Sequence, residues 1–505
     1  MIRYKSIMVV LLLIAINNEG AHQVNVDILK SGVKNWNKWR DTNTNLKPDL
    51  EGANLEGSNL DSARLVGADL EGANLVRAHL LGADLEGANL DSAHLTGAFL
   101  RRVNLEKASI WGANLEGATL RGANLREASL WGTDLVRAQL DSADLREADF
   151  LGANLDSASL WGASLRGANL AVADLRGASL RGVNLEKASI WGATLEETDL
   201  RGADLRGASL WGTDLVRAQL DSADLRGADL LGANLSVASL RGASLRGVNL
   251  RRADLRGAVL EGADLQGGAS LRGADLEGAY LDSADLREAD LRGADLEGAY
   301  LDSTDLRGAS LRGADLAVAF LEGANLEGAN LGGANLGGAN LERADLGKAD
   351  LERANLGKAD LRGADLERAH FYSATLAGAT LAGAHLEGAT LLGADLGKAD
   401  LRGADLGKAD LAGATLAGAH LEGATLLGAI LAGTNLEGAD LSKVKSFYMA
   451  KLDSSILSKL KTKWPEKLAT FWDVKRKDWV IDNTLLEKIK SPAWHGWSEE
   501  KTQGK

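Results

Sequence analysis

The residues best suited to acid–base or metal chemistry are seven histidines, and no two of them have a metal-binding spacing. HxxxH and HExxH pairs, which would place two ligands on one face of a helix, do not occur. The histidines inside the repeats described below also do not recur at twenty-residue intervals, so they do not stack on one another. We therefore expect isolated, solvent-facing histidines and no metal site. They are His22, His79, His94, His370, His385, His420 and His495.

Nucleophilic and phosphate-binding motifs are missing as well. The sequence has no cysteine, which excludes disulfides, thiolate zinc sites, cysteine-ligated iron–sulfur clusters and a cysteine nucleophile. No serine lies in a GxSxG motif, and no GxGxxG joins a strand pattern to a helix pattern. Carboxylates recur at five-residue spacing, which is a repeat property and not an acid–base pair. We expect no enzyme, no cofactor and no small-molecule substrate.

A five-residue repeat accounts for most of the 505 residues. From Leu50 to Leu265, and again from Leu271 to Leu441, every fifth residue is Leu, Ile or Phe, which makes 79 repeats. Ala usually stands two residues before this central residue, a short polar residue stands one before it, and Gly often stands two after it. Such internal self-similarity indicates a solenoid.

The period of five fits neither the 3.6 of a helix nor the 2.0 of a long strand. It fits a short extended step followed by a turn, repeated around an axis. Ala and the central residue then point inward, as alternate residues of a strand do. Gly gives the turn its freedom, and the polar residue before Leu can bond to nearby backbone. The sequence predicts an all-β solenoid.

With these repeats the chain resembles the pentapeptide-repeat family over about 390 residues. The resemblance implies a right-handed quadrilateral β-helix in which four repeats make one coil. Residues 128–146 recur unchanged at 208–226, four coils later, whereas residues 377–394 recur at 412–429, an interval that is not a multiple of twenty. Coils about 4.8 Å apart would give about twenty coils and a rod on the order of 95 Å long.

The flanking segments are expected to cover the open ends of the solenoid, which would otherwise expose unpaired strand edges. We expect an N-terminal cap helix over 22–46, the β-helix over 47–442, and a C-terminal cap with a small basic helical module over 443–505. The register slips once, at Gln266–Gly268, where one extra residue predicts a bulged corner. A hinge or a binding notch is the alternative there.

Within the C-terminal module, two helices are expected. Asp453 would cap the first, which would stop near Pro465. A capping box of Thr484 and Glu487 would begin the second, which would end before Pro492.

This module also holds a basic run, Lys475–Lys477, with Trp472 and Trp479 nearby. The run could contact an acidic surface or be a solvated helix face.

Residues 1–21 have the charge order of a secretory signal. Arg3 and Lys5 precede ten apolar residues from Ile7 to Ile16, followed by polar residues. Ten residues are too few to span a bilayer as a helix. We expect export to the periplasm or the extracellular space. If the segment is instead a helix packed on the cap, or a misassigned start, the protein would be cytoplasmic.

Surface columns are the candidate binding sites, because residues twenty apart stack on the same face. The longest apolar column follows the central residues and should point outward; Ala171 also lies in it. Large apolar stripes on soluble proteins mark contacts, and Trp is enriched at binding hot spots. The column is therefore either a contact for a protein partner or a second copy, or a ladder that stabilises the coils. This Trp column comprises Trp111, Trp131, Leu151, Trp191, Trp211 and Leu231.

A second column appears if the extra residue near Gly267 is discounted, and the same two alternatives apply to it. It contains Val259, Tyr280, Tyr300 and Phe320.

The net charge of −13 is unevenly distributed. Residues 442–505 hold 14 Lys or Arg against 8 Asp or Glu, and residues 1–46 hold 6 against 3, so the repeats carry −22. Such an acidic surface repels nucleic acid. We expect a non-enzymatic scaffold that presents the Trp column to an unidentified protein partner or to itself.

The resemblance implies one alternative function: an acidic mimic of duplex DNA that binds a type II topoisomerase. The export signal and a column of arginines oppose that reading. These arginines are Arg101, Arg121, Arg181, Arg201 and Arg241.

Overall fold

In the computed structural model, the chain winds in coils of twenty residues. Within each unit described below, the residue before a central Leu forms a parallel bridge with its equivalent one coil later, as Asn54 does with Asn74 and Asn335 with Asn355. The central residues and the Ala two before them are buried with few exceptions. Four repeats per coil and the inward-facing positions are thus confirmed.

The structure describes residues 22–473, 478–492, 494 and 496. It divides into two units, Met1–Asn249 and Leu250–Lys505, which are treated separately below. The expected export segment and the basic run Lys475–Lys477 lie outside the described residues.

Backbone hydrogen bonds join successive coils. The N–H of Leu55 donates to the carbonyl of Asn74 at 2.8 Å, and the N–H of Asn74 donates back to Ala53 at 3.0 Å. The N–H of Gly57 donates to Val76 at 2.9 Å, and the N–H of the Ala closes the turn onto the preceding central residue. Four of the five N–H groups in a repeat are satisfied in this way, which leaves the one that follows the central Leu.

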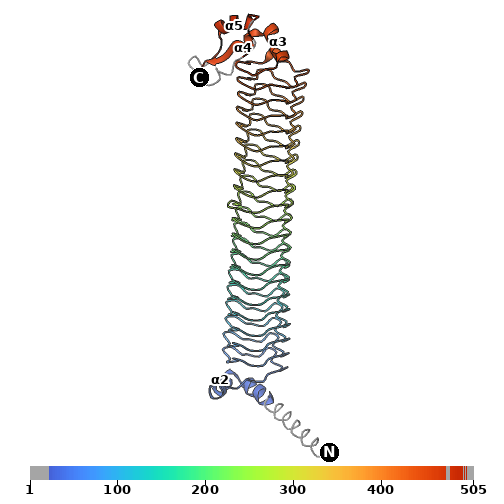
Figure 1. Ribbon diagram of the computed structural model, residues 1–505. Coiled ribbons are helices and arrows are strands. Elements are labelled where there is room, and N and C mark those ends of the chain that lie inside the picture. Colours follow the sequence, from blue (N-terminus) through green and yellow to red (C-terminus); the bar gives the residue numbers. More distant parts are fainter. Residues whose placement is uncertain (1–21, 474–477, 493, 495, 497–505) are drawn as a thin grey trace, which may run out of the picture. The chain divides into compact units, whose positions relative to one another are not determined.

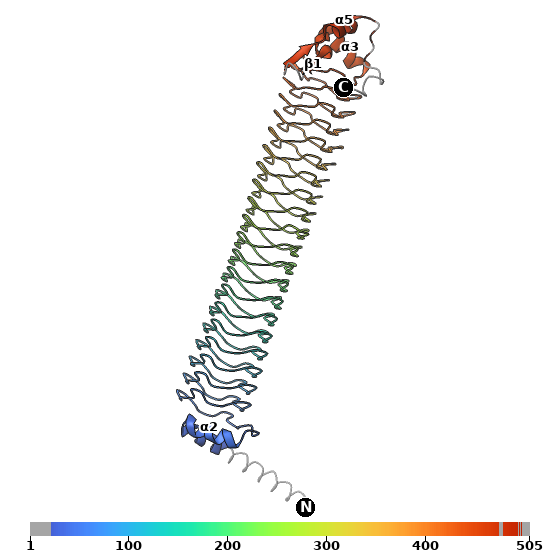
Figure 2. The same cartoon turned by 90° about the vertical axis from the view of Figure 1, so that its left-hand side faces the viewer.

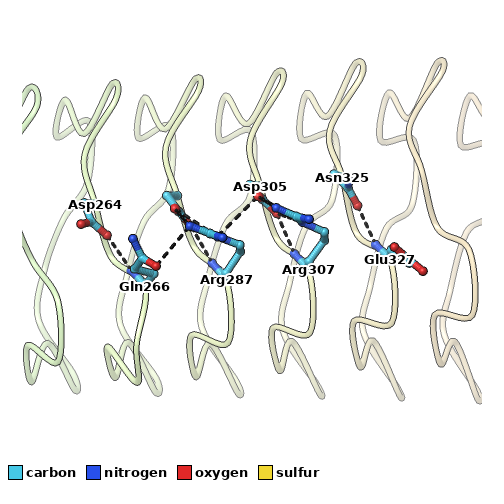
Figure 3. Close-up of polar contacts among 8 residues, drawn as sticks. Asp264, Gln266, Arg287, Asp305, Arg307, Asn325 and Glu327 are labelled. Atoms are coloured by element: carbon cyan, nitrogen blue, oxygen red, sulfur yellow. Dashed lines mark hydrogen bonds and ion pairs between the residues drawn. The ribbon is translucent and has the colours of Figure 1, made fainter.

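A side chain satisfies that remaining N–H. In Figure 3, Oδ1 of Asn325 accepts from the N–H of Glu327 at 3.0 Å. Where the residue before the central position is not Asp or Asn, an Asp one coil earlier can replace it, as Asp91 does for the N–H of Trp111 at 2.9 Å. The demand for this acceptor explains the frequent Asp and Asn before Leu.

The second turn residue of each repeat has a left-handed backbone. Gly57 has φ 60°, and Gly occupies most of the equivalent positions. Three β-branched residues, Val172, Val237 and Val318, adopt φ between 51° and 58°, which is strained for their type. Gly is therefore the residue that fits this corner with least strain, although Ser, Arg, Lys, Glu and Val also occupy it.

In the N-terminal unit, helix α2 (Val33–Thr42) packs on the first coil (Figures 1 and 2). Trp36 is fully buried, and its Nε1–H donates to the carbonyl of Arg64 at 2.8 Å, while Oδ1 of Asn37 accepts from the N–H of Arg64 at 2.9 Å. In later coils, the backbone carbonyl and N–H equivalent to those of Arg64 bond to the preceding coil, so the two side chains take the place of a preceding coil here. Residues 22–30 form a separate helical segment because Gly32, at φ 115°, breaks the expected single helix.

In the C-terminal unit, the extra residue widens one turn without ending the coil. Asp264 bridges Asp285, an offset of 21, and Ser270 bridges Asp290, an offset of 20. Gly267 and Gly268 both have positive φ. The bulged corner predicted from the sequence is confirmed.

Parallel pairing continues past the expected boundary at residue 442. Ser446 bridges Thr425, Lys451 bridges Ile430, and Phe447 is fully buried. The elements that follow the last regular repeat are η1 (Leu441–Lys443), α3 (Ser454–Lys463), α4 (Pro465–Ala469), β1 (Thr470–Asp473), β2 (Asp478–Ile481) and α5 (Asn483–Lys490).

The C-terminal module is mixed, which corrects the expectation of a helical one. Strands β1 and β2 form an antiparallel hairpin in which Trp472 faces Trp479 in the register. Pro465 starts α4 at its first turn, where a missing N–H costs nothing, and does not simply stop α3. No helix among the described residues is both long and apolar enough to cross a bilayer.

The expected helix cap is right in position for α3 and wrong for α5. Asp453 stands at the N-cap of α3, as predicted, although its carboxylate accepts from the N–H of Gly433 at 2.8 Å in the preceding coil and not from the helix. Asp482 caps α5 by accepting from the N–H of Leu485 at 2.8 Å, so Thr484 lies inside the helix and forms no capping box. The helix does end before Pro492, at Lys490.

Leu235→Asp should sharply lower the melting temperature in a circular dichroism melt, because the fully buried Leu235 would become an unpaired charge. The matched control is Val237→Asp in the same corner. Val237 is 60% exposed at φ 58°, and Asp tolerates that backbone better than Val, so this variant should melt at or above the wild-type temperature. An unchanged melt for Leu235→Asp would contradict the inward assignment.

Candidate interaction surfaces

The Trp column lies on one corner of the N-terminal unit and is largely open to solvent. Trp111, Trp131 and Trp211 are 46–47% exposed, and Leu231 is 39% exposed. Leu151 and Trp191 are half-buried.

Stacking joins the tryptophans in pairs. The ring centroids of Trp111 and Trp131 are 5.4 Å apart, and those of Trp191 and Trp211 are 5.2 Å apart, with nearly parallel planes. The stacking predicted from the twenty-residue interval is confirmed.

Ala171 corrects the expectation that every member of this column points into solvent. It is only 1% exposed. Its methyl group is short, and the larger Leu151 and Trp191 occupy the same column one coil to either side. Beside it, Val172 is 52% exposed and adds apolar surface to the same corner. Val172 was not predicted as a contact residue from the sequence, but it could have been found as a Val at a position where the repeat usually has Gly.

Asp91 holds the first tryptophan from the coil below. Its Oδ1 accepts from the N–H of Trp111 at 2.9 Å and from the hydroxyl of Ser109 at 2.5 Å. Trp111 therefore projects from an anchored backbone.

Trp161 was not predicted as a contact residue, because the sequence was searched for apolar columns and the neighbouring residues in its column are charged. It is 58% exposed, and Asp141 accepts its N–H at 3.2 Å. Arg121, Asp141 and Arg181 share its column. A search for exposed Trp in single repeats would have found it.

The second column is a continuous aromatic ladder in the C-terminal unit. Val259 bridges Tyr280, Tyr280 bridges Tyr300, and Tyr300 bridges Phe320. The rings of Tyr280, Tyr300 and Phe320 stack with successive centroids 4.8 Å apart. A further stack, His79 on Phe99 at 4.6 Å in the N-terminal unit, was not anticipated.

Within the described part of the chain, no group of three or more His, Asp or Glu side chains could hold a metal ion. The surfaces described above consist mainly of ladders of like side chains.

A family model for pentapeptide repeats matches most of the chain between residues 48 and 445. The chain belongs to the pentapeptide-repeat family. The right-handed β-helix expected from the sequence follows from this membership. The matched segments are 48–75, 83–122, 123–162, 163–202, 198–236, 233–267, 268–298, 294–333, 304–343, 329–368, 369–407 and 409–445.

Several solved pentapeptide-repeat proteins are similar to parts of the chain. HetL, involved in heterocyst differentiation regulation in the cyanobacterium Nostoc sp. strain PCC 7120, is 39% identical over 42% of this chain and 88% of its own, with a TM-score of 0.24. Rfr23 from the cyanobacterium Cyanothece 51142 is 33% identical over 25% of this chain and 91% of its own, with a TM-score of 0.14.

QnrB1, a plasmid-mediated fluoroquinolone resistance protein, is 21% identical over 39% of this chain and 89% of its own, with a TM-score of 0.15. No curated protein sequence matches the chain.

In many of the repeats, an arginine neutralises the aspartate of the same repeat. In an Asp-Leu-Arg repeat the guanidinium turns back onto the Asp two residues earlier, as Arg287 does on Asp285 at 2.6 Å (Figure 3). Arg287 also approaches Asp305 of the next coil at 3.6 Å. The hydrogen bond from the arginine lowers the pKa of the Asp in ten such repeats. These residues are Asp144, Asp174, Asp199, Asp204, Asp224, Asp285, Asp290, Asp305, Asp360 and Asp400.

These pairs predict a loss of stability in acid. Because the folded pKa lies below the unfolded value of about 3.9, the stabilisation is present above that pH and is lost as pH falls through the folded pKa. The melting temperature should fall on going from pH 5 to about pH 3. Replacing Arg201, Arg206 and Arg226 by Gln should reduce that fall, since the paired Asp would no longer have depressed pKa values. Identical pH profiles for variant and wild type would contradict a role for the pairs.

Proposed function

We propose that the protein is a non-enzymatic scaffold whose Trp column contacts a protein partner or a second copy of the chain. The observation that carries this proposal is the exposure of three tryptophans to 46–47% in one column of a hydrogen-bonded β-helix. Exposed aromatic side chains at this density are costly to leave in water and are enriched at binding hot spots.

The backbone supports such a role by fixing where each side chain projects. Within each of the two units, successive coils are bonded by backbone groups at 2.6–3.2 Å, and the corner of Trp111 is further held by Asp91. Side chains presented from a preorganised backbone lose little entropy on binding.

Mimicry of duplex DNA, with a type II topoisomerase as partner, is the less favoured function. A DNA mimic needs rows of unpaired negative charge, whereas Asp199, Asp204 and Asp224 each bond to an arginine two residues later. Of the arginine column that opposed this reading, Arg201 is in such a pair and Arg121 pairs with Asp141 at 3.1 Å.

We also propose the finer architecture: about twenty coils in all, with the N-terminal helices and the C-terminal module as caps. Trp36 and Asn37 bond to the first coil in place of a preceding one. At the other end, Lys467 of α4 accepts from the N–H of Phe447 through its carbonyl, at 2.9 Å. Both contacts support the cap roles.

Export through residues 1–21 is part of the same proposal. The mass of the mature N-terminus, measured separately in cytosolic and exported fractions, tests it. Loss of about twenty residues with export would support a periplasmic or extracellular scaffold. An intact Met1 in the cytosol would contradict export and favour an intracellular partner.

Replacing Trp111, Trp131, Trp191 and Trp211 by Ser tests the contact role. The circular dichroism spectrum and melting temperature should stay close to wild type, because these side chains lie outside the core. Sedimentation and retention of partners from the host extract should show the loss of self-association or of specific partners. A large fall in melting temperature would instead make the column a structural ladder.

Trp161→Ser is the matched control, since Trp161 is 58% exposed and lies on a different corner. It should retain every partner that the wild type retains. Equal loss with this control would point to non-specific adhesion of exposed tryptophan.

A further inference from the structure

The aromatic ladder of the C-terminal unit, Tyr280, Tyr300 and Phe320, has a surface that neither the fold nor the Trp column explains. Tyr280 is 43% exposed and Phe320 is 40% exposed. The rings stack face to face with nearly parallel planes, so the ring edges along the stack are the part that meets solvent. Val318, at the end of the ladder, is 51% exposed and extends the apolar area.

Carboxylates line both sides of this ladder. Each tyrosine has a Glu three residues before it and an Asp two residues after it, and the coil register stacks these residues into columns beside the rings. We call the two columns the acidic rails. They are Glu277 and Glu297 on one side, and Asp282, Asp302 and Glu322 on the other.

The rails lack the internal neutralisation seen elsewhere. In Figure 3 the corner of Asp305 carries Arg307 two residues later, and the two side chains pair. Among the described residues, Glu277, Glu297, Asp282 and Asp302 form no ion pair, while Glu322 has only Arg343 at 3.6 Å.

Like charges therefore accumulate along one rail. Burial raises the pKa of Asp282, and the negative charges of Asp302 and Glu261 raise it further, against a lowering by the N–H of Asp302. An external cation would relieve this repulsion.

The backbone holds the second rail in place. Oδ1 of Asp282 accepts from the N–H of Asp302 at 3.1 Å, and Oδ1 of Asp302 accepts from the N–H of Glu322 at 2.7 Å. The carboxylates are thus ordered before any ligand arrives, which reduces the entropic cost of binding.

We propose that the aromatic ladder and the acidic rails bind an extended, arginine-rich segment of a partner protein. Planar guanidinium groups pair with carboxylates through two parallel hydrogen bonds, so the charged ends of arginine side chains would bind the rails. The aliphatic stems would cover the exposed rings.

The two rails run along the ladder, which favours an extended occupant. Carboxylates in a rail recur once per coil, about 4.8 Å apart, whereas side chains on one edge of an extended peptide recur about every 6.6–6.8 Å, so the long arginine side chains and not a matched register would bring the charges together. A peptide lying along the ladder directs alternate side chains to the two rails, and both rails are acidic. This surface is separate from the Trp column, and the proposal does not depend on that column.

The test is binding of a fluorescein-labelled hexa-arginine peptide to the full chain, followed by fluorescence anisotropy at two salt concentrations. Saturable binding is expected, weaker at high salt and tighter than that of hexa-lysine, whose ammonium groups cannot pair with a carboxylate through two parallel hydrogen bonds. Replacing Tyr280, Tyr300 and Phe320 by Ser should weaken binding by about tenfold or more, because the apolar surface that the arginine stems cover is removed. The far-ultraviolet circular dichroism spectrum checks that this variant is folded.

A second, more conservative variant neutralises the rails by Glu297→Gln and Asp302→Asn, which keeps an acceptor for the N–H of Glu322. Its matched control is Glu367→Gln with Glu387→Gln, which removes the same charge from a column without aromatic rings. The rail variant should bind about tenfold more weakly, and the control should stay within about twofold of wild type.

Three results would overturn the proposal. Equal weakening in the rail variant and the control would show general attraction to an acidic protein. Unchanged binding in the folded ladder variant would show that the rings take no part. Spermine competing as well as the peptide, charge for charge, would assign the surface to small polycations.

Discussion

Coil-to-coil pairing of the backbone is the constraint on which the structure depends. Each repeat satisfies four N–H groups through backbone carbonyls, three in neighbouring coils and one in its own turn. It needs a side-chain oxygen for the fifth. The inward Leu and Ala, the left-handed turn and the Asp or Asn before Leu all follow from that pattern. Only the outward side chains are left free to vary, so what distinguishes this protein from others with the same repeat is the set of side chains in its surface columns.

This arrangement makes neighbouring charges easy to cancel or to accumulate. An Arg two residues after an Asp closes onto it within one repeat, as Arg287 does on Asp285. A Glu or Asp at the same position leaves the corner negative, as at Glu297 and Asp302. The net charge of the chain therefore says little about any one face.

Much of the fold was predictable from sequence because a five-residue period constrains every repeat alike. The coil of twenty was implied by the resemblance to the pentapeptide-repeat family. Given that coil, the bulge at Gly267 and the stacking of Trp111 on Trp131 were predictable from the numbering. The C-terminal hairpin was not, since β1 and β2 are four residues each and lack a long alternating pattern. Asp482 and Thr484 are both good capping residues, and only the end of β2 decides between them. The acidic rails were missed because the search followed one column at a time.

With four repeats per coil, the number of a residue determines both its coil and the corner of that coil on which it lies. Inserting or deleting twenty residues lengthens a column and leaves every side chain on its original corner. Inserting a single repeat instead shifts all later residues to the next corner, and so exchanges one face for another without disturbing a core residue. The copy of residues 377–394 at 412–429 is such a case: its offset of seven repeats presents the same sequence on a neighbouring corner. Evolution can thus reposition a binding surface around the helix by copying five residues, with the hydrophobic interior unaffected.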